Sequence, residues 1–159
     1  MMHITLITVG TLKESYLCEA VGEYKKRLGA YAKVSEEELK EERIVREDDR
    51  REVAAALEAE GERILKKIPA GAFVVALCVE GKMYSSETLA ALLARAAEIG
   101  GKLCFIIGSS HGLSPKVKSA ADLCLSVSAL TFPHQLMRVM LYEILYRCAT
   151  ITAGKTYHK

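Results

Sequence analysis

The sequence is short of several residue types, and each shortage excludes a class of protein. It has no Trp, three Pro and 11 Gly in 159 residues, which excludes collagen-like and low-complexity chains. Its hydrophobic fraction of 50% excludes intrinsic disorder. No apolar run approaches the roughly 20 residues of a membrane-spanning helix. The N-terminal MMHITLITVG also lacks the basic region of a secretory signal. We therefore expect a soluble cytoplasmic protein with one domain over residues 1–159.

The cysteines show no metal-binding or disulfide pattern. They are odd in number, widely spaced and without a CxxC pair, which argues against a zinc cluster and a disulfide framework. Most lie in apolar runs such as LCFII and LCLSV, so we expect small buried side chains in a reducing compartment and no bound metal. The five are Cys18, Cys78, Cys104, Cys124 and Cys148.

The charge is nearly balanced but unevenly distributed. Residues 102–159 hold seven Lys or Arg and two acidic residues, whereas residues 36–49 hold eight acidic residues and three basic ones. A basic C-terminal part favours an anionic partner such as a phosphate backbone, and chance asymmetry on a solvated surface is the alternative.

Strand and helix patterns alternate along the chain. Short β-branched or continuously apolar runs predict strands at 3–9, 73–79, 103–107 and 123–127. Helical spacing predicts helices at 13–31, 48–68, 85–98, 116–121 and 133–149, followed by a polar tail. The acidic stretch 34–42 is undecided between a helix and an edge strand. The order predicts an α/β fold, a mainly parallel sheet with helices on both faces.

Ligands of such sheets bind beyond the carboxyl ends of the strands. Three segments meet that condition here, residues 77–81, 108–114 and 126–133. The second contains GSSHG, which indicates either a tight turn or a cofactor-binding loop. It does not match the dinucleotide-binding motif GxGxxG. The GKT at 154–156 is not a P-loop, because the required first glycine would be at Ala149.

The last predicted helix is apolar almost all round, which favours a subunit interface over a purely internal position. His134, Arg138 and Tyr142 recur every four residues on it and share one face. They form either an exposed polar stripe or a site for a phosphate or a base. The terminal Tyr157-His158-Lys159 combines an aromatic ring, an imidazole and a cation.

Several motifs together resemble one family over essentially the full length. They are ITLITVG at 4–10, KE at 13–14, Leu77, EGKM at 80–83, IIG at 106–108, GLS at 112–114, SVSALTFPH at 126–134, MR at 137–138 and YHK at 157–159. The chain resembles the RlmH-type ribosomal RNA methyltransferases of the SPOUT class. One departure stands next to Gly108, where many relatives have a second glycine and this chain has Ser109. If that position needs a positive φ, serine would strain it.

The resemblance implies a fold and an activity beyond what the patterns predict. It implies a homodimer with a C-terminal trefoil knot that binds S-adenosylmethionine and methylates N3 of pseudouridine 1915 in 23S ribosomal RNA, on the assembled ribosome. The residues that it assigns to the cofactor are Leu77, Gly108, Val127, Ser128, Ala129, Leu130, Thr131 and Phe132.

The resemblance also suggests which residues act on the base. Arg138 would orient a phosphate or the base, and Tyr157 and His158 would handle the target base, with the tail crossing to the partner's site. His158 could serve as a general base or as an orienting group; His134 is a weaker candidate. The alternative function is a non-catalytic ribosome- or RNA-binding factor of the same fold.

Overall fold

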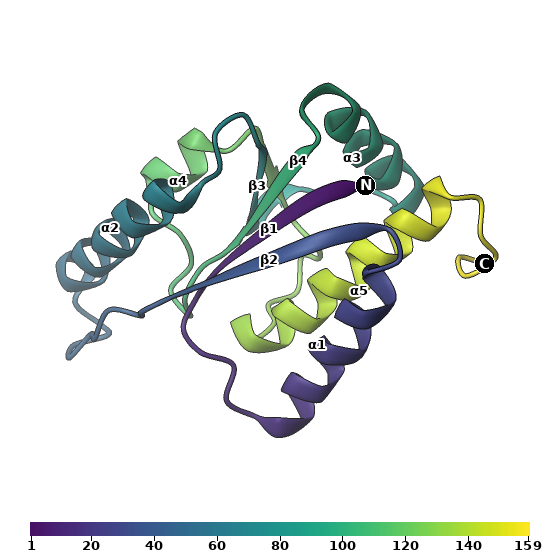
Figure 1. Cartoon of the computed structure of the whole chain (residues 1–159). Coiled ribbons are helices and arrows are strands. Elements are labelled where there is room, and N and C mark those ends of the chain that lie inside the picture. Colours follow the sequence, from purple (N-terminus) through teal and green to yellow (C-terminus); the bar gives the residue numbers. More distant parts are fainter.

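The computed structural model describes all 159 residues and contains one five-stranded sheet with helices on both faces (Figure 1). The strand order is β2-β1-β4-β3-β5, and every neighbouring pair is parallel. The elements in chain order are β1 (Met2–Val9), α1 (Ser15–Leu28), β2 (Ala32–Leu39), α2 (Arg50–Lys67), β3 (Phe73–Lys82), α3 (Ser86–Gly100), β4 (Lys102–Ile107), α4 (Pro115–Ala120), β5 (Leu123–Leu125) and α5 (His134–Thr152). The predicted α/β class with a parallel sheet is confirmed. The trefoil knot stays a prediction.

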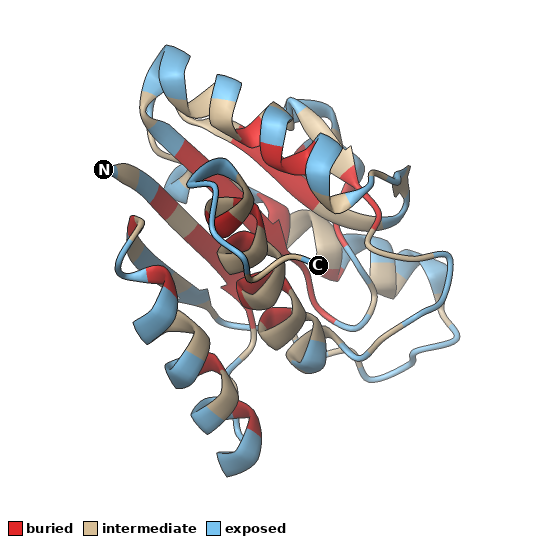
Figure 2. Cartoon of the chain, turned by 90° about the vertical axis from the view of Figure 1, so that its right-hand side faces the viewer, coloured by how far each residue is buried: buried red, intermediate tan, exposed pale blue.

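Helices α1, α3 and α5 cover one face of the sheet, and α2 and α4 cover the other (Figure 1). Each face has its own apolar core, and β4 contributes alternate side chains to both. Residues 103–107 of β4 are therefore buried without a break, as the continuous apolar run predicted. Figure 2 shows the buried residues along the strands and on the helix faces that look toward the sheet.

Residues 34–39 of the undecided acidic stretch belong to the edge strand β2, and residues 40–42 lie in the loop that follows it. Only β1 pairs with β2, so one edge of β2 is open and its acidic side chains remain largely accessible. The predicted end of the last helix near Ala149 was too early, since α5 continues to Thr152. Thr150 is 1% exposed rather than part of a free tail, and its hydroxyl donates to the Arg147 carbonyl at 2.8 Å.

Helix α2 begins after Asp49, whose carboxylate accepts the backbone N–H groups of Arg51 and Glu52 at 2.9 and 3.4 Å. Helix α4 begins after Ser114, which accepts the Val117 N–H at 3.3 Å and is followed by Pro at the first helical position. These caps fix where the strand-end loops stop.

The polar row on α5 is not an exposed stripe, so that alternative is wrong. Arg138 is 4% exposed and Tyr142 is fully buried. Arg138 Nη1 donates to Glu38 at 2.6 Å and Nη2 to the Gly10 carbonyl at 3.0 Å, while the Tyr142 hydroxyl donates to Glu36. The two side chains thus join α5 to the acidic edge strand β2.

The cysteines are all free thiols. Cys104 and Cys148 are buried, whereas Cys18 is exposed, so the expectation of burial was wrong for Cys18. No group of three or more His, Cys, Asp or Glu side chains is placed to hold a metal ion. None of the helices combines the length and apolar character needed to cross a bilayer.

Candidate functional site

A cavity of about 300 Å³ lies at the carboxyl ends of β3, β4 and β5. All three predicted strand-end segments contribute to its walls, and the first turn of α5 adds His134 and Met137. Its volume is at the lower end of the range for small-molecule and cofactor sites. Parallel strands bring their carboxyl ends to one edge of the sheet, which explains why segments far apart in the sequence meet here.

Most of the residues predicted to contact the cofactor line this one cavity. Ala129 is the exception, since it is exposed and does not contribute to the wall. The residues that do line it are Leu77, Gly108, Val127, Ser128, Leu130, Thr131 and Phe132.

Gly108 is required by the close approach of the loop that follows it. A Cβ atom at this position would lie 2.2 Å from the carbonyl oxygen of Gly112. The chain turns back tightly here, with the Gly112 N–H donating to the Ser109 carbonyl at 2.9 Å and Gly112 at φ +88°. Any side chain at 108 would displace backbone and with it the cavity wall.

Ser109, the departure from the family pattern, carries no backbone strain. No residue other than glycine has a positive φ in this chain, so the serine keeps ordinary backbone angles. Its side chain is buried, and its hydroxyl donates to Glu60 Oε1 on α2 at 3.0 Å.

Glu60 is a residue that the sequence analysis missed. It is 3% exposed, and its Oε2 accepts the backbone N–H of Glu42 at 2.9 Å. Burial raises the pKa of its carboxyl, and the two hydrogen bonds oppose that rise. A signal was present in the sequence, because Glu60 lies four residues from both Ala56 and Ile64 on the buried face of its helix.

The segment 127–132 offers backbone groups to a ligand. Ser128 shapes it, since its hydroxyl accepts the Leu130 N–H at 3.0 Å and its carbonyl accepts the Ser126 hydroxyl at 3.0 Å. No other intramolecular hydrogen bond engages the backbone of this segment. The remaining N–H and C=O groups can therefore bind a polar ligand beside the apolar walls of Leu77 and Leu125.

The rim of the cavity carries an ion pair and a thiol. Lys118 on α4 pairs with Glu80 of β3, and this hydrogen bond lowers the pKa of the Glu80 carboxyl. Burial and the neighbouring Cys124 raise the pKa of Cys78 to about 12. Cys78 is therefore a protonated thiol and not a nucleophile.

None of the three residues predicted to act on the base lines this cavity. Arg138 is engaged with β2, as described above. The Tyr157 hydroxyl donates to Glu143 at 2.8 Å and its ring packs edge-on against Tyr146 at 4.8 Å between centroids. His158 Nε2 lies 2.8 Å from Glu87 Oε1, and its Nδ1 lies 3.2 Å from Arg147 Nη1.

These contacts determine the protonation states of Tyr157 in the tail and of Glu87 beside it. The hydrogen bond to Glu143 raises the pKa of Tyr157 to about 12, so its phenol is a donor at neutral pH. The hydrogen bond from His158 is the main cause that lowers the pKa of Glu87 to about 2, so this carboxylate is ionised.

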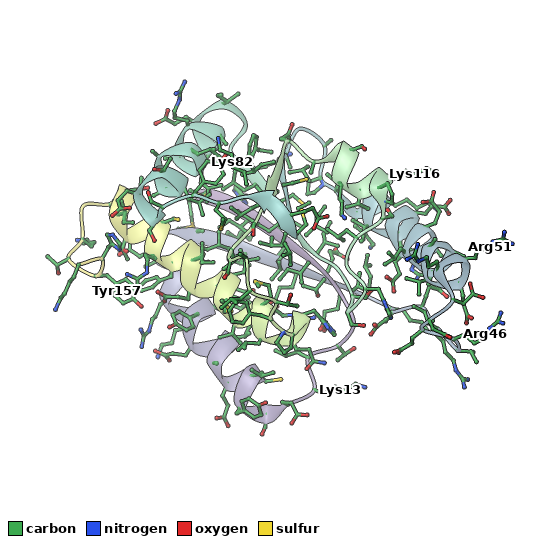
Figure 3. The ribbon with its side chains drawn as sticks, turned by 180° about the vertical axis from the view of Figure 1, so that it is seen from behind. Lys13, Arg46, Arg51, Lys82, Lys116 and Tyr157 are labelled. Atoms are coloured by element: carbon green, nitrogen blue, oxygen red, sulfur yellow. The ribbon has the colours of Figure 1, made fainter.

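The length of α5 separates the tail from the cavity of its own chain. The helix begins at His134 in the cavity wall and has 19 residues, so it spans roughly 28 Å at the rise of an α-helix. Figure 3 shows Tyr157 at the end of the molecule where α5 finishes, far from Arg46 and Arg51. Seven of the eight predicted cofactor residues thus lie around one cavity, and the predicted base-handling residues do not line it.

The parallel sheet and the cavity between three strand-end loops define an α/β protein with a candidate ligand site at the carboxyl edge of the sheet. A family model described as "Predicted SPOUT methyltransferase" matches residues 2–158, and the chain belongs to this family.

Two relatives illustrate the likeness. Ribosomal RNA large subunit methyltransferase H of Bacillus pumilus (strain SAFR-032) is 48% identical over 159 residues, which cover 99% of this chain and 100% of that protein. The protein of the same name from Shouchella clausii (strain KSM-K16) is 46% identical with the same coverage.

A solved structure shows the same fold at much lower identity. It is a "probable methylase family protein" from Haemophilus influenzae Rd KW20, with a TM-score of 0.51 and 12% identity. The match covers 99% of this chain and 70% of that one.

Proposed function

We propose that this protein transfers a methyl group from S-adenosylmethionine to N3 of pseudouridine 1915 in 23S ribosomal RNA, on the assembled ribosome. The relatives named as ribosomal RNA large subunit methyltransferases support the substrate class, since the likeness extends over the full length of both chains. The observation that carries the proposal is the cavity, because seven of the eight residues that the resemblance assigns to the cofactor line it.

The lining of the cavity suits this cofactor in its chemistry. Leu77 and Leu130 offer apolar walls for an adenine ring, and the free backbone groups of 127–132 offer hydrogen bonds to its edge. Gly108 lets the loop 108–114 fold back tightly at the cavity wall, since a Cβ there would meet the Gly112 carbonyl. Once bound, the cofactor supplies an electrophilic methyl group on a sulfonium centre.

The protein's remaining task is to orient the base and remove its N3 proton. We assign Arg138 to orientation of the target nucleotide, which has to compete with Glu38 for Nη1. We assign His158 to the N3 proton or to orientation of the ring, and Tyr157 to donation of a hydrogen bond, in keeping with its raised pKa.

The tail can perform these roles only in the cavity of a second chain. The roughly 28 Å length of α5 keeps Tyr157 and His158 away from the cavity of their own chain. We therefore propose a homodimer in which each tail completes the partner's site. Exposed apolar side chains near the cavity suit a subunit contact, since Leu130 is 70% and Leu136 37% exposed.

Two measurements test the function. Mass spectrometry of ribosomal RNA from cells that lack the gene should show unmethylated pseudouridine 1915, and purified protein added to their ribosomes with the cofactor should restore the methyl group. Calorimetry should show binding of S-adenosylmethionine. If the protein binds ribosomes but neither binds the cofactor nor restores the methyl group, the non-catalytic RNA-binding factor is the correct function.

A further inference from the structure

Helix α2 fixes both ends of the loop that follows β4. At the start of the loop, the buried Glu60 accepts the Ser109 hydroxyl at 3.0 Å. At its end, the next helical residue, Gly61, lets Ser114 approach so closely that a Cβ on Gly61 would lie 2.3 Å from the serine oxygen. Consecutive residues of one helix thus hold the two ends of the segment that includes Gly108 and Gly112.

The second carboxylate oxygen of Glu60 is also occupied. It accepts the Glu42 N–H at 2.9 Å from the loop between β2 and α2. Arg63, one turn further along α2, holds the same loop through the Glu42 carboxylate at 2.7 Å and the Lys40 carbonyl at 2.9 Å. The Glu60 side chain is therefore fixed from both sides and can act as a rigid support for Ser109.

A buried carboxylate is costly unless its hydrogen bonds are made. Glu60 is kept at 3% exposure although it does not line the cavity, and its partner Ser109 does line it. Ser109 also makes the turn that brings Gly112 against Gly108. Glu60 therefore acts on the cavity wall through the side chain of Ser109.

We propose that Glu60 is a positioning residue for S-adenosylmethionine binding, acting through the Ser109 hydroxyl to hold the loop 108–114 in its ligand-binding shape. This inference rests on the proposed function, since it takes S-adenosylmethionine as the ligand of the cavity.

The test is a set of variants measured by calorimetry with S-adenosylmethionine. Glu60→Ala should raise the Kd roughly tenfold, because loss of one charge-assisted hydrogen bond in the supporting contact is of that order. Ser109→Ala should raise it by a similar factor, and the double variant should be no weaker than the weaker single variant, since both remove the same contact. Glu60→Gln should rescue binding to within about threefold of the unchanged protein, because an amide can still accept from Glu42 and donate to Ser109.

Glu52 provides the matched control. It lies on the same helix and its carboxylate accepts the backbone N–H groups of Val45 and Arg46 at 2.6 and 3.2 Å, and it makes no hydrogen bond to the loop 108–114. Glu52→Ala should therefore leave the Kd unchanged even if it lowers the melting temperature. Hydrogen exchange of the ligand-free proteins should show faster exchange of the amides at 109–113 in Glu60→Ala and Ser109→Ala only.

The outcomes separate the two proposals. If the unchanged protein does not bind the cofactor, the proposed function fails. If it binds and Glu60→Ala keeps the same Kd, or the two single effects add in the double variant, or Glu60→Gln binds as weakly as Glu60→Ala, the role of Glu60 is overturned. Should Glu60→Ala not fold, Ser109→Ala and Glu60→Gln decide alone: an unchanged Kd for the first, or a tenfold loss for the second, would overturn it.

Discussion

Gly108 is the residue at which side-chain size decides whether the cavity exists. Gly108→Ala would place a Cβ 2.2 Å from the Gly112 oxygen and 2.9 Å from Leu113 Cδ2, so backbone has to move. We expect a loss of roughly 2–4 kcal/mol in unfolding free energy and a cofactor Kd raised at least about tenfold. Urea unfolding and calorimetry measure the two effects.

Gly22 on α1 provides the control for that substitution. A Cβ there meets nothing within 4 Å, so Gly22→Ala should stabilise the helix by about 0.5–1 kcal/mol and leave the Kd unchanged. If Gly108→Ala binds the cofactor as tightly as Gly22→Ala does, the tight turn is not needed for the cavity.

Because the Tyr142 hydroxyl donates a hydrogen bond to Glu36, we expect the contribution of Tyr142 to the unfolding free energy to fall at acidic pH. Partial burial favours a raised pKa for Glu36, but hydrogen bonds from Lys25 and Tyr142 outweigh it and lower that pKa. A lowered folded-state pKa contributes stability above the unfolded-state value, and this contribution is lost as pH falls through the folded-state value. Tyr142→Phe should therefore cost about 2 kcal/mol at neutral pH, and the difference should shrink below about pH 4.

Urea unfolding at pH 7 and near pH 3.5 checks this prediction. Tyr16→Phe is the matched control, because Tyr16 is 66% exposed and its hydroxyl has no partner; its effect should stay within about 0.5 kcal/mol. An equal cost of Tyr142→Phe at both pH values would show that the hydrogen bond to Glu36 is not its cause.

At the scale of the helices, α2 can contact the start of α4 only because residue 61 is a glycine. Gly61→Ala would push a Cβ to 2.3 Å from Ser114 Oγ, the atom that caps α4 by accepting the Val117 N–H. We expect a loss of roughly 1–3 kcal/mol, since the substitution displaces the cap and overpacks the contact.

Ser114→Ala alone should cost about 1 kcal/mol for the lost cap. Because it also removes the atom that clashes, the double variant should be clearly more stable than the sum of the two single effects predicts. If denaturant unfolding instead shows that the two losses of unfolding free energy simply add, the destabilisation by Gly61→Ala does not arise from its contact with Ser114.

The helices and strands were largely predictable, for reasons that the structure makes plain. Continuous apolar runs are covered on both faces, as in β4, and caps such as Asp49 and Ser114 stand where the helices begin. The acidic strand β2 was not decided, because its side chains are held by tertiary partners rather than by an alternating pattern: Arg138 and Tyr142 lie about a hundred residues further along the chain.

At the scale of the whole molecule, the site was predictable only in part. The rule for parallel sheets locates the strand-end cavity, and seven of the eight residues that the resemblance assigns to the cofactor line it. Sequence patterns do not report distance, so the separation of Arg138, Tyr157 and His158 from the cavity could not be read from them. Glu60 was missed because a carboxylate on a helix is ordinarily solvated, and only the fold brings Ser109 to it.

The separation of tail and cavity leads to a prediction about the assembly. Deletion of residues 157–159 should abolish methylation but leave cofactor binding unchanged, because these residues do not line the cavity of their own chain. Thr131→Trp, at an exposed position of the cavity wall, should block cofactor binding without disturbing the core. Each variant alone should be inactive in a ribosome methylation assay.

Mixed dimers of the two variants distinguish action in the partner's site from action in the same chain. After subunit exchange of equal amounts, half of the dimers are mixed, and each has one intact cavity facing one intact tail if the tail crosses over. Activity should then recover to about a quarter of that of the unchanged protein, whereas a tail that serves its own chain would give no recovery, since no single chain has both parts. The same mixture kept from exchanging subunits should stay inactive, which assigns any recovered activity to the mixed dimer.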